Sequence, residues 1–351
     1  MGKRIVIMAG GTGGHVFPAL AVAQWFIDEG WSVSWLGTRK GLEAKVVPEH
    51  GIDIDWLSVA GVRGKGLLSK ATSLFKLIKA CSQAFSILRR RKPHVVLGLG
   101  GFVAGPGGLM ARVLNIPLVI HEQNRVPGTT NRLLAKFANQ VLEAFPDSFK
   151  KDINAKCTGN PLRKQFLNVS TIKAPLNGRD LRLLIIGGSQ GAQALNEIIP
   201  DALCNLTEIE AWHQTGAAMQ EQVAKRYLEL GINAKATAFI NDMVAAYQWA
   251  DIIICRAGAM TVSEVAAMAL PAIMIPLPNA IDDHQLANAR FLSEAGAGLI
   301  LPQKELNATN LLNLINTAKN QLESMVKAAH QCARMDATKT VANYCINEAK
   351  L

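Results

Sequence analysis

Apolar residues gather in short continuous runs along this chain, and most runs are followed by a segment whose apolar positions recur at helical spacing. The first run covers residues 5–8 (IVIM), and the helical pattern behind it extends to about residue 29. Further runs lie at residues 31–37, 52–59, 94–98 and 117–122. Helical patterns lie at residues 40–50, 67–91 and 131–139. Continuous apolar runs are typical of strands buried on both faces, so this alternation predicts a parallel α/β sheet.

The same pattern restarts near residue 178. Residues 181–186 (LRLLII) form another apolar run, and residues 187–192 (GGSQGA) follow it as a glycine turn, which repeats the beginning of the chain. Later runs lie at residues 210–214, 236–239, 252–255 and 272–276, and the chain is helical by pattern from residue 307. We therefore expect an α/β protein of two Rossmann-like domains that face each other across a cleft, with parallel sheets flanked by helices. The expected divisions are an N-terminal domain of residues 1–163, a C-terminal domain of residues 164–340, and a helix of residues 341–351 that packs back on the first domain.

The first strand leads into a glycine-rich motif, residues 10–15 (GGTGGH). Four glycines between a strand and a helix allow the backbone to turn tightly and to approach a ligand closely. The N–H groups at the start of the helix favour an anionic group such as a phosphate. His15 places a group that titrates near neutral pH at the mouth of this anion site, where it is either a catalytic or a structural histidine. The plainer alternative for the motif is an ordinary tight turn, which needs fewer glycines.

The glycine turns lack the signatures of two common classes of nucleotide-binding protein. Residues 10–15 lack the Gly-Lys-Ser/Thr ending of a P-loop, and no turn has the full G-x-G-x-x-G spacing of a dinucleotide fold. Phosphoryl transfer and hydride transfer are therefore disfavoured. Two tandem domains with phosphate-friendly turns point instead to a ligand cleft between domains.

Charge is divided unequally along the chain, whose net charge is +10. Residues 1–163 carry 22 Lys and Arg against 10 Asp and Glu, whereas residues 164–351 carry 15 against 17. This asymmetry predicts an anionic partner for the first half, either nucleic acid or an acidic membrane surface.

The six cysteines have no CxxC spacing, which predicts reduced thiols in a cytoplasmic protein. We expect no signal peptide, and no stretch approaches 18 uninterrupted apolar residues.

Five motifs stand in a characteristic order and spacing: residues 10–15 (GGTGGH), 121–124 (HEQN), 159–163 (GNPLR), 187–192 (GGSQGA) and 256–264 (RAGAMTVSE). Together they resemble the MurG family of peptidoglycan glycosyltransferases, which have the two-domain GT-B fold, and the resemblance covers essentially the whole chain. It implies an inverting transfer of N-acetylglucosamine from UDP-GlcNAc to the C4 hydroxyl of the muramoyl sugar of lipid I (undecaprenyl-diphosphate-MurNAc-pentapeptide). The products are lipid II and UDP, in a step of cell-wall synthesis that also serves cell shape and division.

The resemblance also implies a donor site in the C-terminal domain, and an acceptor and membrane site in the N-terminal domain. His15 is then the general base, although it could instead orient the acceptor diphosphate. The implied UDP-GlcNAc contacts are Thr12, Gly13, Gly14, Asn124, Arg163, Ser189, Ile240, Ala259, Met260, Thr261, Val262, Ser263, Glu264 and Gln285. Among these, the Glu264 carboxylate suits a ribose diol, and the backbone of Ile240 is the expected uracil contact. The plainer alternative for Glu264 is a first-turn glutamate that complements the helix dipole.

No cofactor and no metal are expected. GT-B enzymes as a class need no bound metal to stabilise the leaving UDP, and helix N-termini together with Arg163 could supply that stabilisation. The Asp282-Asp283 pair is the one feature that suggests a metal.

The stretch of residues 63–92 combines basic and apolar side chains. Such a helix suits an anionic bilayer surface. Together with the lipid-linked acceptor that the resemblance implies, it leads us to expect a peripheral protein on the cytoplasmic face of the bacterial inner membrane. The expected membrane contacts are Leu67, Leu68, Lys70, Phe75, Lys76 and Lys79. Part of the same helix could instead face the core, through a stripe at Leu74, Leu77, Ile78, Cys81 and Phe85. Other cell-wall synthesis proteins are further expected partners.

Two alternatives come from different classes. One is another GT-B enzyme, such as a UDP-GlcNAc 2-epimerase or a glycolipid-forming transferase, since these share the paired domains and a ribose-binding glutamate. The other is a nucleic-acid-binding protein, suggested by the basic half. The basic residues, however, alternate with aliphatic side chains rather than base-stacking aromatics, so we expect no nucleic-acid partner.

Overall fold

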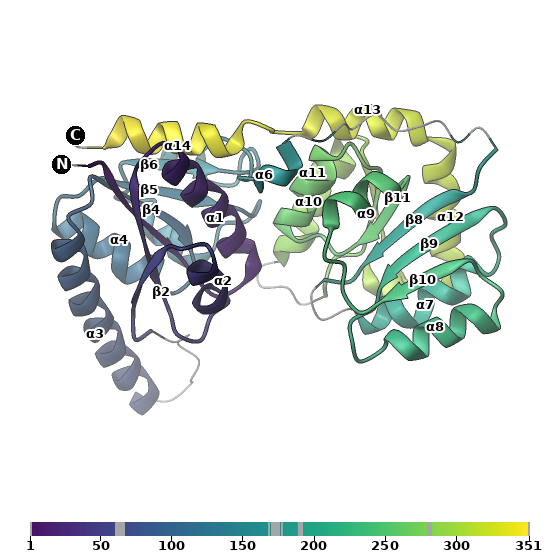
Figure 1. The fold of residues 1–351 in the computed structure, drawn as a ribbon, viewed down its shortest axis with the longest axis horizontal. Coiled ribbons are helices and arrows are strands. Elements are labelled where there is room, and N and C mark those ends of the chain that lie inside the picture. Colours follow the sequence, from purple (N-terminus) through teal and green to yellow (C-terminus); the bar gives the residue numbers. More distant parts are fainter. Residues whose placement is uncertain are drawn as a thin grey trace. The chain divides into compact units, whose positions relative to one another are not determined.

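The computed structural model describes residues 2–59, 67–167, 169, 176, 178–188, 192–278 and 283–349, with side chains in the long helix that starts at Leu67 described from residue 74 onward. The chain forms two compact units. The first unit comprises Met1–Arg163 and Met335–Leu351, and the second comprises Lys164–Arg334. Both are α/β units with parallel sheets flanked by helices (Figure 1).

The sheet of the first unit has seven parallel strands among the described residues, in the order β3-β2-β1-β4-β5-β6-β7. The strands are β1 (Arg4–Ala9), β2 (Ser32–Gly37), β3 (Asp53–Trp56), β4 (Val95–Gly100), β5 (Leu118–Glu122), β6 (Gln140–Glu143) and β7 (Lys156–Cys157). In register, Ile7 of β1 pairs with Trp35 on one side and Leu97 on the other. The order reverses between β1 and β4, so the loops that follow these two strands meet at the same place.

Helices cover both faces of this first sheet. They are α1 (Gly13–Asp28), α2 (Glu43–Glu49), α3 (Leu67–Arg91), α4 (Ala104–Val113), α5 (Thr129–Leu134) and α14 (Ala337–Glu348), with a short 3-10 helix η1 at Lys151–Ile153. Ile5 and Ile7 of β1 point into a core shared with α1 and α14. Val6 and Met8 point into the opposite core, which α3 and α4 cover. Successive residues of a strand face opposite sides, so the apolar run of β1 supplies both cores.

The second unit repeats the plan with six parallel strands among the described residues, in the order β10-β9-β8-β11-β12-β13. They are β8 (Leu181–Ile186), β9 (Ile209–Gln214), β10 (Ala234–Thr237), β11 (Ile252–Cys255), β12 (Ala272–Met274) and β13 (Gly298–Ile300). The helices are α6 (Lys164–Leu167), α7 (Gln193–Leu203), α8 (Gln220–Glu229), α9 (Met243–Trp249), α10 (Ala259–Ala267), α11 (His284–Glu294), α12 (Ala308–Asn320) and α13 (Leu322–Cys332), with the 3-10 helix η3 at Gln303–Glu305. Its switch point lies between β8 and β11.

Several elements differ from the sequence prediction. The glycines at residues 105–108 lie inside α4. A Cβ at Gly107 or Gly108 would collide with Met8 and Leu134 respectively, so these two glycines allow close helix packing. The helix expected at residues 131–139 is α5, which ends at Leu134, and strand β6 begins at Gln140. The short strands β6, β7 and β13 were not expected.

The last helix belongs to the first unit. α14 packs against α1 and against β4, β5 and β6 (Figure 1), and its Val341, Ala342 and Cys345 are fully buried. The expected boundary at residue 340 therefore differs from the structure, which assigns Met335 onward to the first unit. The difference arises because α14 starts at Ala337, whose side chain is already buried.

Candidate functional site

The loops at the switch point of the first sheet lie in direct contact. The loop after β4 contains Gly101 at a φ of +77°, and a Cβ on this residue would overlap the carbonyl oxygen of Gly10 in the loop after β1. Only glycine meets both requirements. In parallel sheets the ligand crevice lies outside the carboxyl ends of the strands at the switch point, so this is the expected location of a site.

His15 lies at this point of contact. It is the third residue of α1, and its backbone N–H donates to the Thr12 carbonyl at 3.1 Å. A Cβ on Gly100, at the end of β4, would lie 2.9 Å from His15 Cδ2 and 3.1 Å from Nε2. The imidazole therefore packs over Gly100, with Asn131 of α5 on the same side. Thr12 is the extended N-cap of α1, and Gly13 and Gly14 are its first two residues, whose N–H groups have no acceptor within the helix.

A buried carboxylate positions the asparagines beside this loop. Glu122, at the end of β5, accepts hydrogen bonds from the backbone and side-chain nitrogens of Asn124 at 2.9 and 3.2 Å. Its second oxygen accepts from the Gly128 N–H at 3.0 Å and from Asn131 Nδ2 at 2.9 Å. Asn124, a predicted contact, and Asn131, which was not predicted, are thus held by the same side chain.

His121 is a structural histidine. It is fully buried, its Nε2 lies 3.0 Å from the Gly159 carbonyl oxygen, and its Nδ1 lies 3.0 Å from Gln123 Nε2. Because Nε2 must donate to a carbonyl, Nδ1 accepts from the Gln123 amide. Burial lowers the pKa of His121 to about 4, against smaller opposing effects of the Gly159 carbonyl and Glu122. The ring is therefore neutral and ties β5 to residues 159–160.

Arg163 lies in the first unit as its last residue before the chain passes to the second. Its guanidinium lies 5.5 Å from the centroid of the Phe17 ring, on the first turns of α1. The structure thus brings Thr12, Gly13, Gly14, His15 and Asn124 to one edge of the first sheet, with Arg163 beside α1.

The second unit presents Glu264 from α10. The helix begins after the extended N-cap Gly258, and Glu264 is its sixth residue. The interpretation of Glu264 as a first-turn glutamate is therefore wrong, because it lies in the second turn. Its Oε2 accepts a hydrogen bond from the buried Tyr247 hydroxyl of α9 at 3.0 Å, which fixes the direction of the carboxylate.

The other predicted residues of this unit lie near the carboxyl ends of its strands. Ile240 follows β10, has a buried side chain, and forms no backbone hydrogen bond with other described residues. Gln285 of α11 accepts from the Leu277 N–H at 2.9 Å. Residues 259–263 form the first turn of α10 and the start of its second, and Ser263 Oγ donates to the Ala259 carbonyl at 3.0 Å.

Arg256 connects this motif to its neighbours. Its guanidinium donates to the carbonyl of Ile275 at 3.0 Å and to Gln303 Oε1 at 2.7 Å, and burial lowers its pKa. Ser189 lies outside the described residues, as does Asp282. In the part of the chain that the structure describes, no group of three or more His, Cys, Asp or Glu side chains could hold a metal ion.

The predicted membrane helix is α3. Its apolar stripe is exposed rather than core-facing: Leu74, Phe75 and Ile78 are 59%, 70% and 59% exposed. The core-facing stripe consists instead of Ala80, Ala84, Ile87 and Leu88, so the expected stripe through Leu74, Leu77 and Ile78 is wrong. Lys76 and Lys79 are exposed, and the side chains of Leu67, Leu68 and Lys70 lie outside the described residues. No described helix is both long and apolar enough to cross a membrane.

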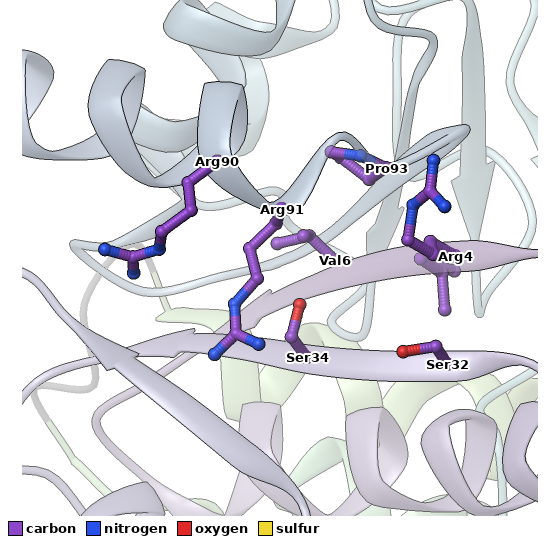
Figure 2. Close-up of a pocket in the computed structure, with 8 residues that line it drawn as sticks. Arg4, Val6, Ser32, Ser34, Arg90, Arg91 and Pro93 are labelled. Atoms are coloured by element: carbon purple, nitrogen blue, oxygen red, sulfur yellow. The ribbon is translucent and has the colours of Figure 1, made fainter.

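A hollow of about 280 Å³ lies at the opposite edge of the first sheet (Figure 2). It is lined by the amino ends of β1 and β2 and by the end of α3. Its arginines hold the structure together: Arg90 and Arg91 both contact Asp55, at 2.6 and 2.7 Å, and Arg4 Nε donates to the Lys92 carbonyl at 2.8 Å. Because it lies at the amino ends of the strands, this hollow is separate from the glycine loop, which follows the carboxyl end of β1.

Sequence reasoning missed Glu43, which lies beneath the first glycine loop. Its side chain is fully buried, and its Oε2 accepts from the Gly11 N–H at 3.0 Å. The available signal was a glutamate preceded by two glycines in GTRKGLE, residues 37–43. Glu122 lies in the HEQN motif of residues 121–124, but the sequence predicted no role for it.

Two Rossmann-like units of parallel strands are the architecture of glycosyltransferases with the GT-B fold. Residues 5–143 match the glycosyltransferase family 28 N-terminal domain, and residues 182–343 match the glycosyltransferase family 28 C-terminal domain. A crystal structure of Acinetobacter baumannii MurG superposes with a TM-score of 0.86 at 40% identity, covering 98% of this chain and 99% of that one.

Relatives extend the same likeness over the full length. The UDP-N-acetylglucosamine–N-acetylmuramyl-(pentapeptide) pyrophosphoryl-undecaprenol N-acetylglucosamine transferase of Methylococcus capsulatus is 56% identical over 354 residues, covering 99% of both proteins. The kitacinnamycin glycosyltransferase shares the fold alone, with a TM-score of 0.76 at 14% identity, over 99% of this chain and 100% of that one. The chain belongs to the MurG family within glycosyltransferase family 28.

Proposed function

We propose that this protein transfers N-acetylglucosamine from UDP-GlcNAc to the C4 hydroxyl of the muramoyl sugar of lipid I, giving lipid II and UDP. The observation that carries the proposal is the 56% identity, over 99% of both chains, with a transferase named for this donor and acceptor. The site geometry supports it, since each unit places polar groups at the carboxyl edge of a parallel sheet.

The first unit binds the acceptor in this proposal. The resemblance implies that Gly13 and Gly14 contact UDP-GlcNAc. We propose instead that their N–H groups at the start of α1 bind the acceptor diphosphate. His15 takes the proton of the C4 hydroxyl while the oxygen attacks the anomeric carbon. The bond from that carbon to the UDP oxygen breaks with its electron pair, so a single displacement inverts the configuration.

The second unit binds the donor in this proposal. The Glu264 carboxylate accepts hydrogen bonds from the ribose hydroxyls, while the Tyr247 hydroxyl holds one of its oxygens in place. The backbone of Ile240 pairs with uracil, and Gln285 contacts the sugar. The N-terminus of α10 faces the developing charge on the leaving diphosphate, with Ser189 and Arg163 as further contacts, and no metal takes part.

The protein binds the membrane peripherally in this proposal. The acceptor carries a polyprenyl chain that cannot leave the bilayer, so the enzyme must come to it. The exposed Phe75, Lys76 and Lys79 of α3 suit an anionic bilayer surface, here the cytoplasmic face of the inner membrane.

The experiment that tests this function is a transfer assay with lipid I and labelled UDP-GlcNAc. Wild-type protein produces lipid II and UDP, whereas His15→Ala lowers kcat by about 10²- to 10⁴-fold because the general base is lost. Its affinity for UDP changes little. His50→Ala, at an exposed histidine after α2, is the matched control and keeps wild-type turnover.

Two outcomes contradict the proposed function, and a third contradicts only the role of His15. Epimerised UDP-sugar formed without acceptor identifies a 2-epimerase, and sugar transfer to diacylglycerol identifies a glycolipid-forming transferase. Near-normal turnover by His15→Ala removes the base role from His15 while leaving the transfer itself in place.

A further inference from the structure

The carboxylate of Glu43 joins two loops of the first unit. Glu43 is the first residue of α2, yet its side chain is fully buried. Oε2 accepts from the Gly11 N–H at 3.0 Å, in the loop after β1. Oε1 accepts from the N–H and the hydroxyl of Thr38, at 2.9 and 2.7 Å, in the loop after β2. All three donors are neutral groups, so the Glu43 carboxylate acts toward them as a hydrogen-bond acceptor and not as an ion-pair partner.

Three glycines make the space for this side chain. A Cβ on Gly10 would lie 2.7 Å from Oε1, one on Gly37 would lie 2.9 Å from Cγ, and one on Gly41 would overlap the carboxylate. None of these three glycines has a positive φ. Space for Glu43, and at Gly37 also for Ile54, therefore explains why they are glycines better than backbone conformation does.

The peptide at Gly11 is held on both sides. The Gly11 N–H donates a hydrogen bond to the Glu43 carboxylate, and the Gly11 carbonyl accepts one from the Leu42 N–H at 3.3 Å. Gly11 has a φ of +98°, which lets the chain reverse into Thr12 and the start of α1. Because only one residue separates Gly11 from the first helical N–H groups, the orientation of this peptide determines where they and His15 point.

A carboxylate is the group that fits this position. It only accepts hydrogen bonds, and it meets N–H or O–H donors at both oxygens. Glutamine has the same shape but would turn an NH₂ group toward either Gly11 N–H or Thr38. A buried donor would then lose its acceptor.

We propose that Glu43 is a positioning residue for sugar transfer, which holds the glycine loop so that Gly13, Gly14 and His15 face the acceptor. This role rests on the proposed function of the first unit. It acts through Gly11 and makes no contact with the reacting atoms, so its loss affects acceptor use and leaves the donor site in the second unit intact.

The test compares Glu43→Gln with Glu49→Gln, an exposed glutamate of the same helix. Steady-state kinetics are measured with lipid I and UDP-GlcNAc varied separately, well below the unfolding temperature of each variant. Glu43→Gln is expected to lower kcat/KM for lipid I by about 10- to 100-fold, since a displacement near 1 Å can cost that much. KM for UDP-GlcNAc and Kd for UDP stay within about twofold, and Glu49→Gln matches wild type.

Thr38→Val and Thr38→Ser provide milder variants. Thr38→Val removes the hydroxyl donor and is expected to lower kcat/KM for lipid I about three- to tenfold. Thr38→Ser keeps the hydroxyl and is expected to retain the wild-type kcat/KM. A purely structural role predicts instead a lower Tm with an unchanged KM for lipid I and a kcat that follows the folded fraction. That result, or wild-type kinetics in Glu43→Gln, overturns the proposal.

A readout without catalysis separates this proposal from the proposed function. Hydrogen exchange of the Gly11 amide and the NMR signals of the His15 ring are recorded in wild type and in Glu43→Gln. Faster exchange and shifted ring signals support the positioning role even if the wild-type protein transfers no sugar. Unchanged exchange and unchanged ring signals overturn it.

Discussion

At the scale of single residues, three carboxylates of this protein are oriented by neutral donors. Glu43 is held by backbone N–H groups and a hydroxyl, Glu122 by asparagine and backbone nitrogens, and Glu264 by the Tyr247 hydroxyl. Hydrogen bonds to charged groups are stronger than those between neutral groups. Such bonds therefore fix the direction of a side chain or loop without a cation beside the carboxylate.

The donor assignment predicts the behaviour of Glu264→Ala. This variant is expected to raise KM for UDP-GlcNAc and Kd for UDP by about 10- to 100-fold, since a hydrogen bond to a charged group is worth about 1.5–3 kcal/mol. The ribose contact is made in ground and transition states alike, so kcat at saturating donor changes little. Isothermal titration with UDP and steady-state kinetics measure both quantities.

Tyr247→Phe is the companion variant. It removes the hydroxyl that orients the carboxylate and leaves the carboxylate itself, so its effect on UDP affinity is smaller than that of Glu264→Ala. If Glu264→Ala binds UDP as wild type does, Glu264 is a structural residue of α10 and the donor assignment fails.

The candidate site was predictable from sequence where a motif marks the backbone. Residues 10–15 follow a strand and precede a helix, so their place at the sheet edge follows from the parallel topology. Glu43 and Asn131 lie near this loop only through the fold, because β2 and β5 flank β1 and β4 in the sheet. No local pattern distinguishes such a glutamate from one that begins a surface helix.

At the scale of elements, α3 is longer than the sheet that it covers. Its 25 residues extend about 37 Å, whereas the six residues of β1 extend about 20 Å. The C-terminal part of α3 packs on the sheet through Ala84, Ile87 and Leu88. The N-terminal part exceeds the sheet and has no core to cover, which explains its exposed apolar side chains.

This geometry predicts how α3 binds membranes. The double variant Lys76→Glu/Lys79→Glu is expected to weaken binding to anionic vesicles by at least about thirtyfold, since each basic residue at the surface is worth about 1 kcal/mol. UDP affinity remains that of wild type. Co-sedimentation at several salt concentrations measures the effect.

The matched control is Lys319→Glu/Lys327→Glu, at exposed lysines of the second unit, which binds vesicles as wild type does. Equal binding of wild type to neutral and anionic vesicles, insensitive to salt, contradicts the electrostatic mechanism.

The long apolar runs were predicted as strands, and β1, β2, β4, β5, β8, β11 and β12 lie within or across them. The strands that sequence did not reveal are two to four residues long, which is too short for a periodic signal. The glycines of α4 pack against Met8 and Leu134, a role that only the folded sheet reveals.

At the scale of the whole molecule, each unit buries one neutral histidine. Burial lowers the pKa of His121 in the first unit to about 4 and that of His213 in the second to about 3. The ordinary value of about 6.5 holds in the unfolded chain. Below that pH the unfolded state binds more protons than the folded state, so stability falls as pH falls.

We expect urea unfolding to show that the free energy of unfolding of each half of the molecule is about 2 kcal/mol lower at pH 5 than at pH 7. The decrease is about 1.4 kcal/mol for each step of one in pH below 6.5. We limit the comparison to pH 5 and above because burial raises the pKa of Glu143. Protonation of Glu143 at lower pH therefore stabilises the folded state and opposes the effect of the histidines. His213→Gln is expected to be less stable at pH 7 but to lose the pH dependence of the second unit. An unchanged pH dependence in that variant contradicts the assignment.

The return of the chain in α14 has a consequence for biosynthesis. The buried Val341, Ala342 and Cys345 complete the core of the unit that also contains residue 4. The nascent first unit therefore leaves the ribosome without part of its core, and all of Lys164–Arg334 must be translated before the missing helix emerges. At roughly 5–20 residues per second, this interval lasts on the order of ten seconds or more. During that time the apolar surface that α14 later covers is open to chaperones.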